Sequence, residues 1–170
     1  YSCLNQDLDF QFNGSEVRWV TNVMAGNLSV KRNKFIEVGG FDENFSPPVA
    51  YRFETEFARR IIVKGGKVRF VPEASIRHLR ASTGGTRSKG NHLKSVSPIY
   101  GMGDYYYALS CGKGRDKWFY ICKRPFREVR TKFHLSHPWW IPVKCIGEVR
   151  AFFQALKLNR QGPKLMDPKR

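Results

Sequence analysis

"FDENFSPPVAYRFETEFARRIIVKGGKVRFV" runs from Phe41 to Val71 and contains two regular patterns separated by turn signals. Apolar residues recur at helical spacing between Phe53 and Lys64. The pair Gly65–Gly66 follows at once, where a helix C-terminus favours a residue with positive φ. Residues 67–71 then alternate as a strand does. The stretch therefore predicts a helix that is followed directly by a short strand.

Similar patterns extend toward the N-terminus. Residues 17–23 alternate imperfectly and predict a strand, and residues 31–38 predict a short helix that ends at Gly39–Gly40. Toward the C-terminus, residues 74–79 predict another short strand. Residues 80–91 are a polar Gly/Ser/Thr loop with three cations, which we expect to cover a ligand.

The last third of the chain has a different composition. Residues 103–114 predict a helix, and the following segment mixes aromatic residues with cations. A final helix carries Val149, Phe152, Phe153 and Leu156 on one stripe, with Glu148, Arg150, Gln154 and Lys157 on its other faces.

Positive charge is concentrated in one half of the chain. The 170 residues hold 30 Lys and Arg against 14 Asp and Glu, a formal net charge of +16. Residues 1–76 contribute 10 cations and 9 acids, a net of +1, and residues 77–170 contribute 20 and 5, a net of +15. The basic half predicts an anionic partner, for which nucleic acid, diphosphates and acidic lipid headgroups all qualify.

Composition excludes several classes of protein. Apolar residues make up 41% of the chain, which argues against disorder, and no apolar run approaches the roughly 18 residues of a spanning helix. The four cysteines lie far apart, so we expect reduced thiols in a cytoplasmic protein rather than a zinc site or a disulfide framework. No signal-peptide pattern follows Tyr1.

Four of the 14 acids lie close together, at Asp42, Glu43, Glu54 and Glu56. Acids in the first turn of a helix are stabilised by its macrodipole, and Glu56 can pair with Arg60 one turn later. The alternative is that one acid faces a cleft as a general base, within about 3 Å of a hydroxyl group.

His78 also has two interpretations. A histidine on a short strand is commonly a structural hydrogen-bonding residue. Beside a Gly-rich basic loop, however, imidazole can bind a metal ion while the loop binds phosphate oxygens. The sequence leaves both interpretations open.

Together these motifs resemble a known family. "AGNLSVKRNKFIEVGGFDENF", the acidic helix start and "GGKVRFVPEASIRH" resemble the C-terminal half of family 2 glycosyltransferases of the GT-A fold, strongly over residues 16–80. The looser continuation resembles a sugar-transferring bacterial branch. The resemblance implies an α/β fold: residues 1–97 form the C-terminal portion of a GT-A domain, and residues 98–170 a helical, basic extension.

The resemblance implies roles for single residues. Glu54 falls on the second acid of the family's Glu-Asp pair, which is the catalytic base, and Phe53 takes the place of the first acid. Glu56 and Arg60 match residues with a structural role. His78 matches the histidine that completes the metal site.

Further positions match the substrate side of that family. Gly26 and Asn27 match positions near the donor sugar, and Arg87 is expected to contact the diphosphate. Asp42 and Glu43 match loop acids near the acceptor, which either form the turn or contact the acceptor directly.

The resemblance implies an inverting transfer of a hexosyl or deoxyhexosyl group from a nucleotide-sugar donor to the hydroxyl group of a lipid-linked or saccharide acceptor. Such a reaction would belong to cell-surface polysaccharide or glycolipid synthesis, with a divalent metal ion (Mg²⁺ or Mn²⁺) as cofactor. We expect a cytoplasmic protein, peripheral at the inner face of the cell membrane. Its amphipathic tail helix either binds anionic lipids or packs on the catalytic domain.

The family's βαβ nucleotide-binding half and Asp-x-Asp motif have no match, since "DLD" at residues 7–9 follows no apolar strand. We therefore expect a fragment. Two other classes stay open: a nucleic-acid-binding module, for which no specific motif is present, and a non-catalytic remnant that binds a membrane or a partner.

Overall fold

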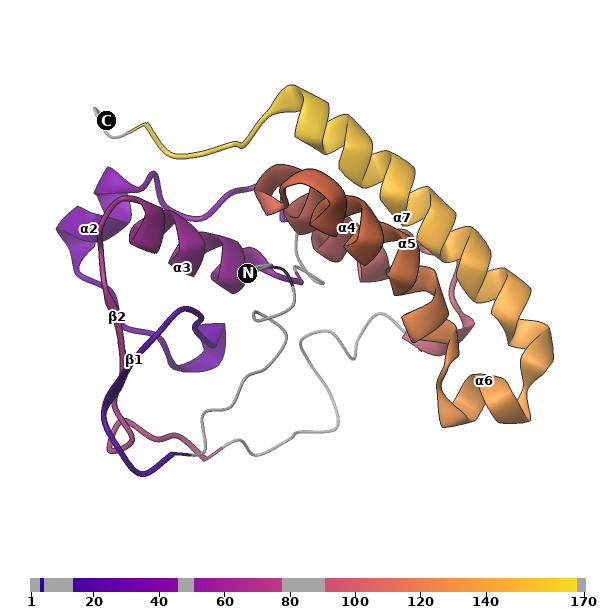
Figure 1. Cartoon of the computed structure of the whole chain (residues 1–170), viewed down its shortest axis with the longest axis horizontal. Helices are drawn as coiled ribbons and strands as arrows, with labels where there is room; N and C mark the ends of the chain where they lie inside the picture. Colours follow the sequence, from indigo (N-terminus) through magenta and orange to yellow (C-terminus); the bar gives the residue numbers. More distant parts are fainter. Residues whose placement is uncertain (1–3, 5–13, 46–50, 78–90, 168–170) are drawn as a thin grey trace.

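The computed structural model describes residues 4, 14–45, 51–77 and 91–167. Strands, α-helices and 3₁₀-helices (η) follow one another as β1 (Arg18–Val20), η1 (Ala25–Asn27), α2 (Arg32–Glu37), α3 (Phe53–Val63), β2 (Val68–Phe70), η3 (His92–Lys94), α4 (Ile99–Cys111), α5 (Gly114–Val129), α6 (Lys132–Ser136), η4 (Pro138–Trp140) and α7 (Ile141–Gln161). In Figure 1 the two strands lie beside α2 and α3, whereas α4, α5 and α7 form a second group of helices. None of the described helices has the length and apolar character needed to cross a membrane.

The strands and helices around residues 31–71 agree with the sequence patterns. β1 and β2 form an antiparallel pair in which Trp19 lies opposite Arg69. Gly39 and Gly40 end α2, and Gly65 follows α3, all three with φ between 66° and 81°. Only glycine adopts this conformation at little cost, so these predicted helix ends are confirmed.

One predicted strand is wrong. Residues 74–77, the described part of the expected strand 74–79, form a turn and irregular backbone. Pro72 precedes this segment, and the amide of Ala74 donates to the carbonyl of Val71, which closes a turn instead of extending a strand.

Helix α4 lies at the centre of the helical group, because residues 100–109 are all buried. Glycines allow this burial. A Cβ atom added at Gly103 would lie 2.2 Å from the carbonyl oxygen of Tyr51, and one at Gly101 would lie 3.0 Å from Cβ of Ala151. The segment before α3 and helix α7 therefore approach α4 to backbone distance.

The apolar stripe of α7 is divided between the core and the surface. The buried residues of α7 are Lys144, Gly147, Glu148, Ala151 and Ala155, whereas Val149 and Phe153 are 56% and 62% exposed. Phe152 and Leu156 do contact the core. Small residues face α4 because they let the two helices approach closely, which a stripe of large apolar residues would prevent.

The C-terminal segment returns to the turn that follows α2. In Figure 1 it runs from the end of α7 back toward α2. The amide of Met166 donates to the carbonyl of Gly39 (2.8 Å), and the amide of Glu43 donates to the carbonyl of Lys164 (3.1 Å). The segment after α7 is thus attached to the Gly-Gly turn and the acidic loop.

Candidate functional site

Helix α3 carries the two first-turn acids. It begins after Arg52, whose φ of 73° is unusual for a residue with a side chain. Oxygen Oε2 of Glu54 is buried and has no hydrogen-bond partner among the described residues. Burial raises the pKa of Glu54, although its own backbone amide and Arg52 lower it in part. A carboxylate with an unpaired oxygen and a raised pKa is chemically suited to accept a proton.

Glu56 lies two residues further on but is fully paired. Arg60 donates through Nε to Oε1 of Glu56 (2.5 Å) and through Nη2 to Oε2 (2.8 Å). The same guanidinium donates to the carbonyls of Val38 and Gly40. The predicted pairing of Glu56 with Arg60 is confirmed, and its effect is to hold the end of α2 against α3.

Asp42 is buried and binds three groups of the protein. Oδ1 accepts from the amides of Asn44 (3.0 Å) and Lys164 (3.0 Å), and Oδ2 accepts from the hydroxyl of Tyr106 (2.7 Å). These bonds form the turn and attach the C-terminal segment to it. They match the turn-forming interpretation, and a contact between Asp42 and an acceptor stays a prediction.

An open groove of about 840 Å³ runs along β1, η1, α2 and β2. Asn27 lines it, and its side-chain amide donates to the carbonyl of Ala74. Gly26 lies beside Asn27 on η1. No acid is among the described residues that line the groove, whereas four cations are: Lys31, Lys34, Lys67 and Arg69. Lys34 is paired with Glu37 (2.6 Å), so the positive charge that an anionic ligand would meet comes mainly from the other three. Neither Glu54 nor Asp42 is part of its described lining.

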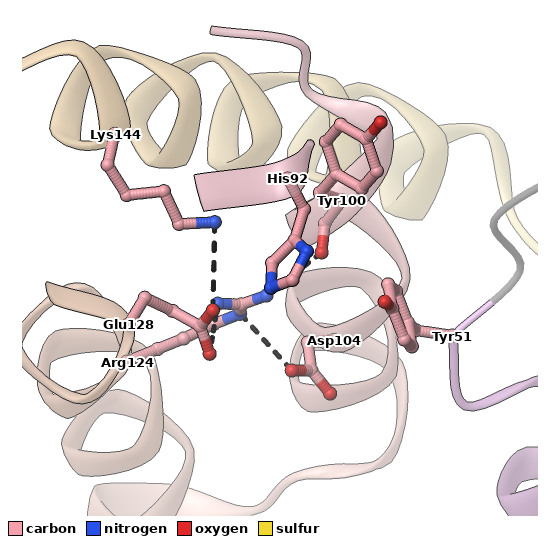
Figure 2. Close-up of a pocket in the computed structure, with 7 residues that line it drawn as sticks. All are labelled: Tyr51, His92, Tyr100, Asp104, Arg124, Glu128 and Lys144. Carbon is pink, nitrogen blue, oxygen red and sulfur yellow. Dashed lines mark hydrogen bonds and ion pairs between the residues drawn. The ribbon is translucent and has the colours of Figure 1, made fainter. Parts of the chain in front are cut away.

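A second, smaller cavity of about 160 Å³ lies between the helices. Figure 2 shows polar side chains from several elements converging on it: Tyr51, His92, Tyr100, Asp104, Arg124, Glu128 and Lys144. Arg124 contacts Glu128 (3.2 Å) and Glu148 (2.9 Å), and Lys144 contacts Glu148 (3.1 Å). The cavity wall is therefore a network of paired charges.

Asp104 connects this network to the start of α3. Its carboxylate contacts Arg52 (2.8 Å), Arg124 (3.3 Å) and Arg127 (3.0 Å). Burial alone raises the pKa of Asp104, but Arg124 and Arg52 outweigh that effect and hold it below its usual value. Arg52 immediately precedes α3, so the ion pair fixes the start of the helix that carries Glu54.

Sequence patterns missed this network. Asp104 is the only acid in α4, within the otherwise uncharged run IYGMGDYYYALSC, and that isolation was the available signal. An acid on an apolar helix needs a buried cation as partner. Nothing in the local pattern shows that the cation is Arg52, which is separated from Asp104 by 52 residues.

Two predicted site residues, His78 and Arg87, lie outside the described residues. Within the part of the chain that the structure describes, no group of three His, Cys, Asp or Glu side chains is placed to bind a metal ion. The metal role of His78 stays a prediction.

Comparison with known proteins gives one partial similarity. The chain is 36% identical over 59 residues to "Putative polypeptide N-acetylgalactosaminyltransferase 10" of Drosophila melanogaster. The aligned part is 35% of this chain, and the chain spans 9% of that protein's length. No family model and no solved structure matches. Part of the chain is thus similar to a glycosyltransferase.

Proposed function

We propose that the chain forms the acceptor-side part of an inverting glycosyltransferase, with Glu54 as the general base. The observation that carries this proposal is the buried, unpaired Oε2 of Glu54 in the first turn of α3. Glu56, from the same turn, is paired and serves the fold. The partial similarity to a glycosyltransferase supports the same reaction class.

In the proposed reaction, an acceptor hydroxyl attacks the anomeric carbon of a nucleotide-sugar donor. The acceptor proton passes to Glu54, a bond forms between the acceptor oxygen and the anomeric carbon, and the bond from that carbon to the diphosphate breaks. The nucleoside diphosphate leaves with the electron pair. Burial favours Glu54 as the base, because a raised pKa brings its proton affinity closer to that of the acceptor.

The groove along β1 and β2 is the proposed donor side. Lys31, Lys67 and Arg69 attract a diphosphate, and Asn27 can bind a sugar hydroxyl. Gly26 lies next to Asn27, and a Cβ atom added there would meet no atom within 4 Å. Arg87 is proposed as a further diphosphate contact, and Asp42 as a residue that shapes the acceptor loop.

A divalent ion, if bound, would neutralise the departing diphosphate, and His78 is the residue we propose to hold it. The proposed fold is the C-terminal portion of a GT-A domain over residues 1–97, with a basic helical extension over 98–170. Transfer of a hexosyl or deoxyhexosyl group in polysaccharide or glycolipid synthesis, by a peripheral cytoplasmic protein, belongs to the same proposal.

The test is nucleotide release by the full-length protein. UDP-, GDP-, dTDP- and CMP-linked sugars are each supplied with Mg²⁺ or Mn²⁺ and with a set of saccharide acceptors. We expect acceptor-dependent release from one donor class.

Lys31→Gln with Lys67→Gln should raise the KM for that donor about tenfold or more, because both cations line the groove. The control is Arg130→Gln with Lys132→Gln, two exposed cations outside the groove. Absence of release from every donor, or an equal effect of both pairs, would contradict the proposal.

A further inference from the structure

Helix α7 has two faces of different character. Its inner face packs on α4 through small residues and carries Glu148, which is 2% exposed and paired with Arg124 and Lys144. The opposite face is exposed to solvent: Ile146, Val149 and Phe153 are 53%, 56% and 62% exposed. Apolar side chains of this size are usually buried when they recur at helical spacing.

Six residues make up this α7 outer face: Ile146, Val149, Arg150, Phe153, Lys157 and Arg160. At 3.6 residues per turn they fall within about 100° of the helix circumference. Its apolar members occupy the first half of the face, and Arg150, Lys157 and Arg160 are exposed beside or beyond them. The face therefore joins an apolar patch to a cationic one.

Acids are missing from this face. Glu148 is the only acid of α7, and it points to the buried side. None of the three cations of the α7 outer face belongs to a described ion pair with an acid. Their positive charge is thus directed at solvent and is complementary to an anionic surface.

We propose that the α7 outer face binds the surface of an anionic lipid bilayer, with the helix lying parallel to it. Ile146, Val149 and Phe153 would enter the boundary between headgroups and acyl chains. Arg150, Lys157 and Arg160 would contact lipid phosphates. A helix that combines an apolar strip with cations, and is too polar to span the bilayer, has the composition of an interfacial helix.

A bilayer fits this face better than a nucleic acid does. Phosphate contacts would use the cations, but they would leave Ile146 and Val149 in water, and these side chains cannot stack on bases. Anionic lipid satisfies both halves of the face, because it supplies phosphates above an apolar layer.

The test measures co-sedimentation of the purified chain with lipid vesicles. Vesicles of phosphatidylglycerol mixed with phosphatidylcholine should bind the chain, whereas vesicles of phosphatidylcholine alone should bind it at least tenfold more weakly. Lys157→Gln with Arg160→Gln should lower binding about 25-fold, because each cation near the surface contributes about fivefold. Arg130→Gln with Lys132→Gln removes the same charge from exposed positions outside α7 and should lower binding about twofold or less.

The apolar half is tested with Ile146→Gln and Phe153→Gln together. We expect about a tenfold loss of vesicle binding and unchanged circular dichroism, since both side chains are already exposed. The matched control is Val63→Gln with Leu135→Gln, where both residues are 76% exposed but lie on other helices.

Three results would overturn the proposal: equal losses in both charge pairs, equal losses in both apolar pairs, or equal binding to neutral vesicles. A fourth would replace it. If single-stranded DNA binds and loses affinity with Lys157→Gln and Arg160→Gln, while vesicles do not bind, the face is a nucleic-acid surface. The assay needs no sugar nucleotide, so its outcome is independent of the proposed glycosyl transfer.

Discussion

Replacing Asp104 with asparagine should destabilise the chain strongly. The carboxylate lies within 2.8–3.3 Å of nitrogen atoms from Arg52, Arg124 and Arg127, and it accepts a hydrogen bond from Tyr120 (3.3 Å). Asparagine keeps the shape but removes the charge and turns one acceptor oxygen into a donor. Breaking a buried ion pair by removing one partner costs about 3–5 kcal/mol of unfolding free energy.

The lower end of that range applies here. Arg124 keeps two carboxylate partners, Glu128 and Glu148, so only part of its charge becomes unpaired. Arg52, whose side chain is 9% exposed, has Asp104 as its described ion-pair partner. We therefore expect a loss of about 3 kcal/mol, which for a chain of this size lowers Tm by about 6–12 °C.

The measurement is urea unfolding followed by circular dichroism near neutral pH. The control is Asp116→Asn, an exposed acid in the first turn of α5, which should cost about 0.5 kcal/mol. A loss below about 1 kcal/mol for Asp104→Asn, or one equal to the control, would refute the view that this carboxylate joins α4 to the start of α3.

The difference in unfolding free energy between the parent chain and Asp104→Asn depends on pH, and the pKa of Asp104 fixes the direction. The pKa of Asp104 in the folded chain lies below its ordinary value of 3.8. Its stabilising contribution is therefore complete above about pH 5 and is lost as the pH falls through the folded-state pKa. The gap between the parent chain and Asp104→Asn should stay constant between neutral pH and about pH 5, and close only in stronger acid.

Three further changes test the site and its supports by urea unfolding. Glu54→Gln should raise stability near neutral pH by about 1 kcal/mol, because it removes a half-buried carboxylate with one unpaired oxygen, whose charge solvent screens in part. A raised folded-state pKa means that this gain disappears below about pH 4, and a loss of stability instead would show that both oxygens are paired. Gly103→Ala should cost about 3 kcal/mol or more, since its Cβ would overlap the carbonyl oxygen of Tyr51, and a cost below about 1 kcal/mol would exclude this close packing. Tyr106→Phe should cost about 1.5–3 kcal/mol by removing the hydroxyl that donates to Asp42, and an unchanged midpoint would contradict that role.

Local patterns were sufficient for the segments around Phe41–Val71. Helical spacing and paired glycines predicted α2, α3 and β2, because each is defined by residues adjacent in sequence and by a φ that glycine supplies. The same reasoning placed Glu56 against Arg60, one helical turn away.

Longer-range features could not be predicted in this way. Glu54 and Glu56 are equivalent first-turn acids in the sequence, and only burial and partners separate the unpaired one from the paired one. The inner face of α7 could not be predicted, because Ala151 gains its importance from close approach to Gly101 of α4, and Gly147 from close approach to the backbone of Ser95 and Val96, which hydrophobicity does not record.

The most direct test of the proposed glycosyl transfer is kcat of the full-length protein with Glu54→Gln, measured on the donor and acceptor that the release assay identifies. Removal of a general base should lower kcat about 10²–10⁴-fold and leave the donor KM within about twofold. Glu73→Gln, at an exposed acid outside α3, should leave both constants unchanged. An unchanged kcat for Glu54→Gln would contradict the role of Glu54 as the base.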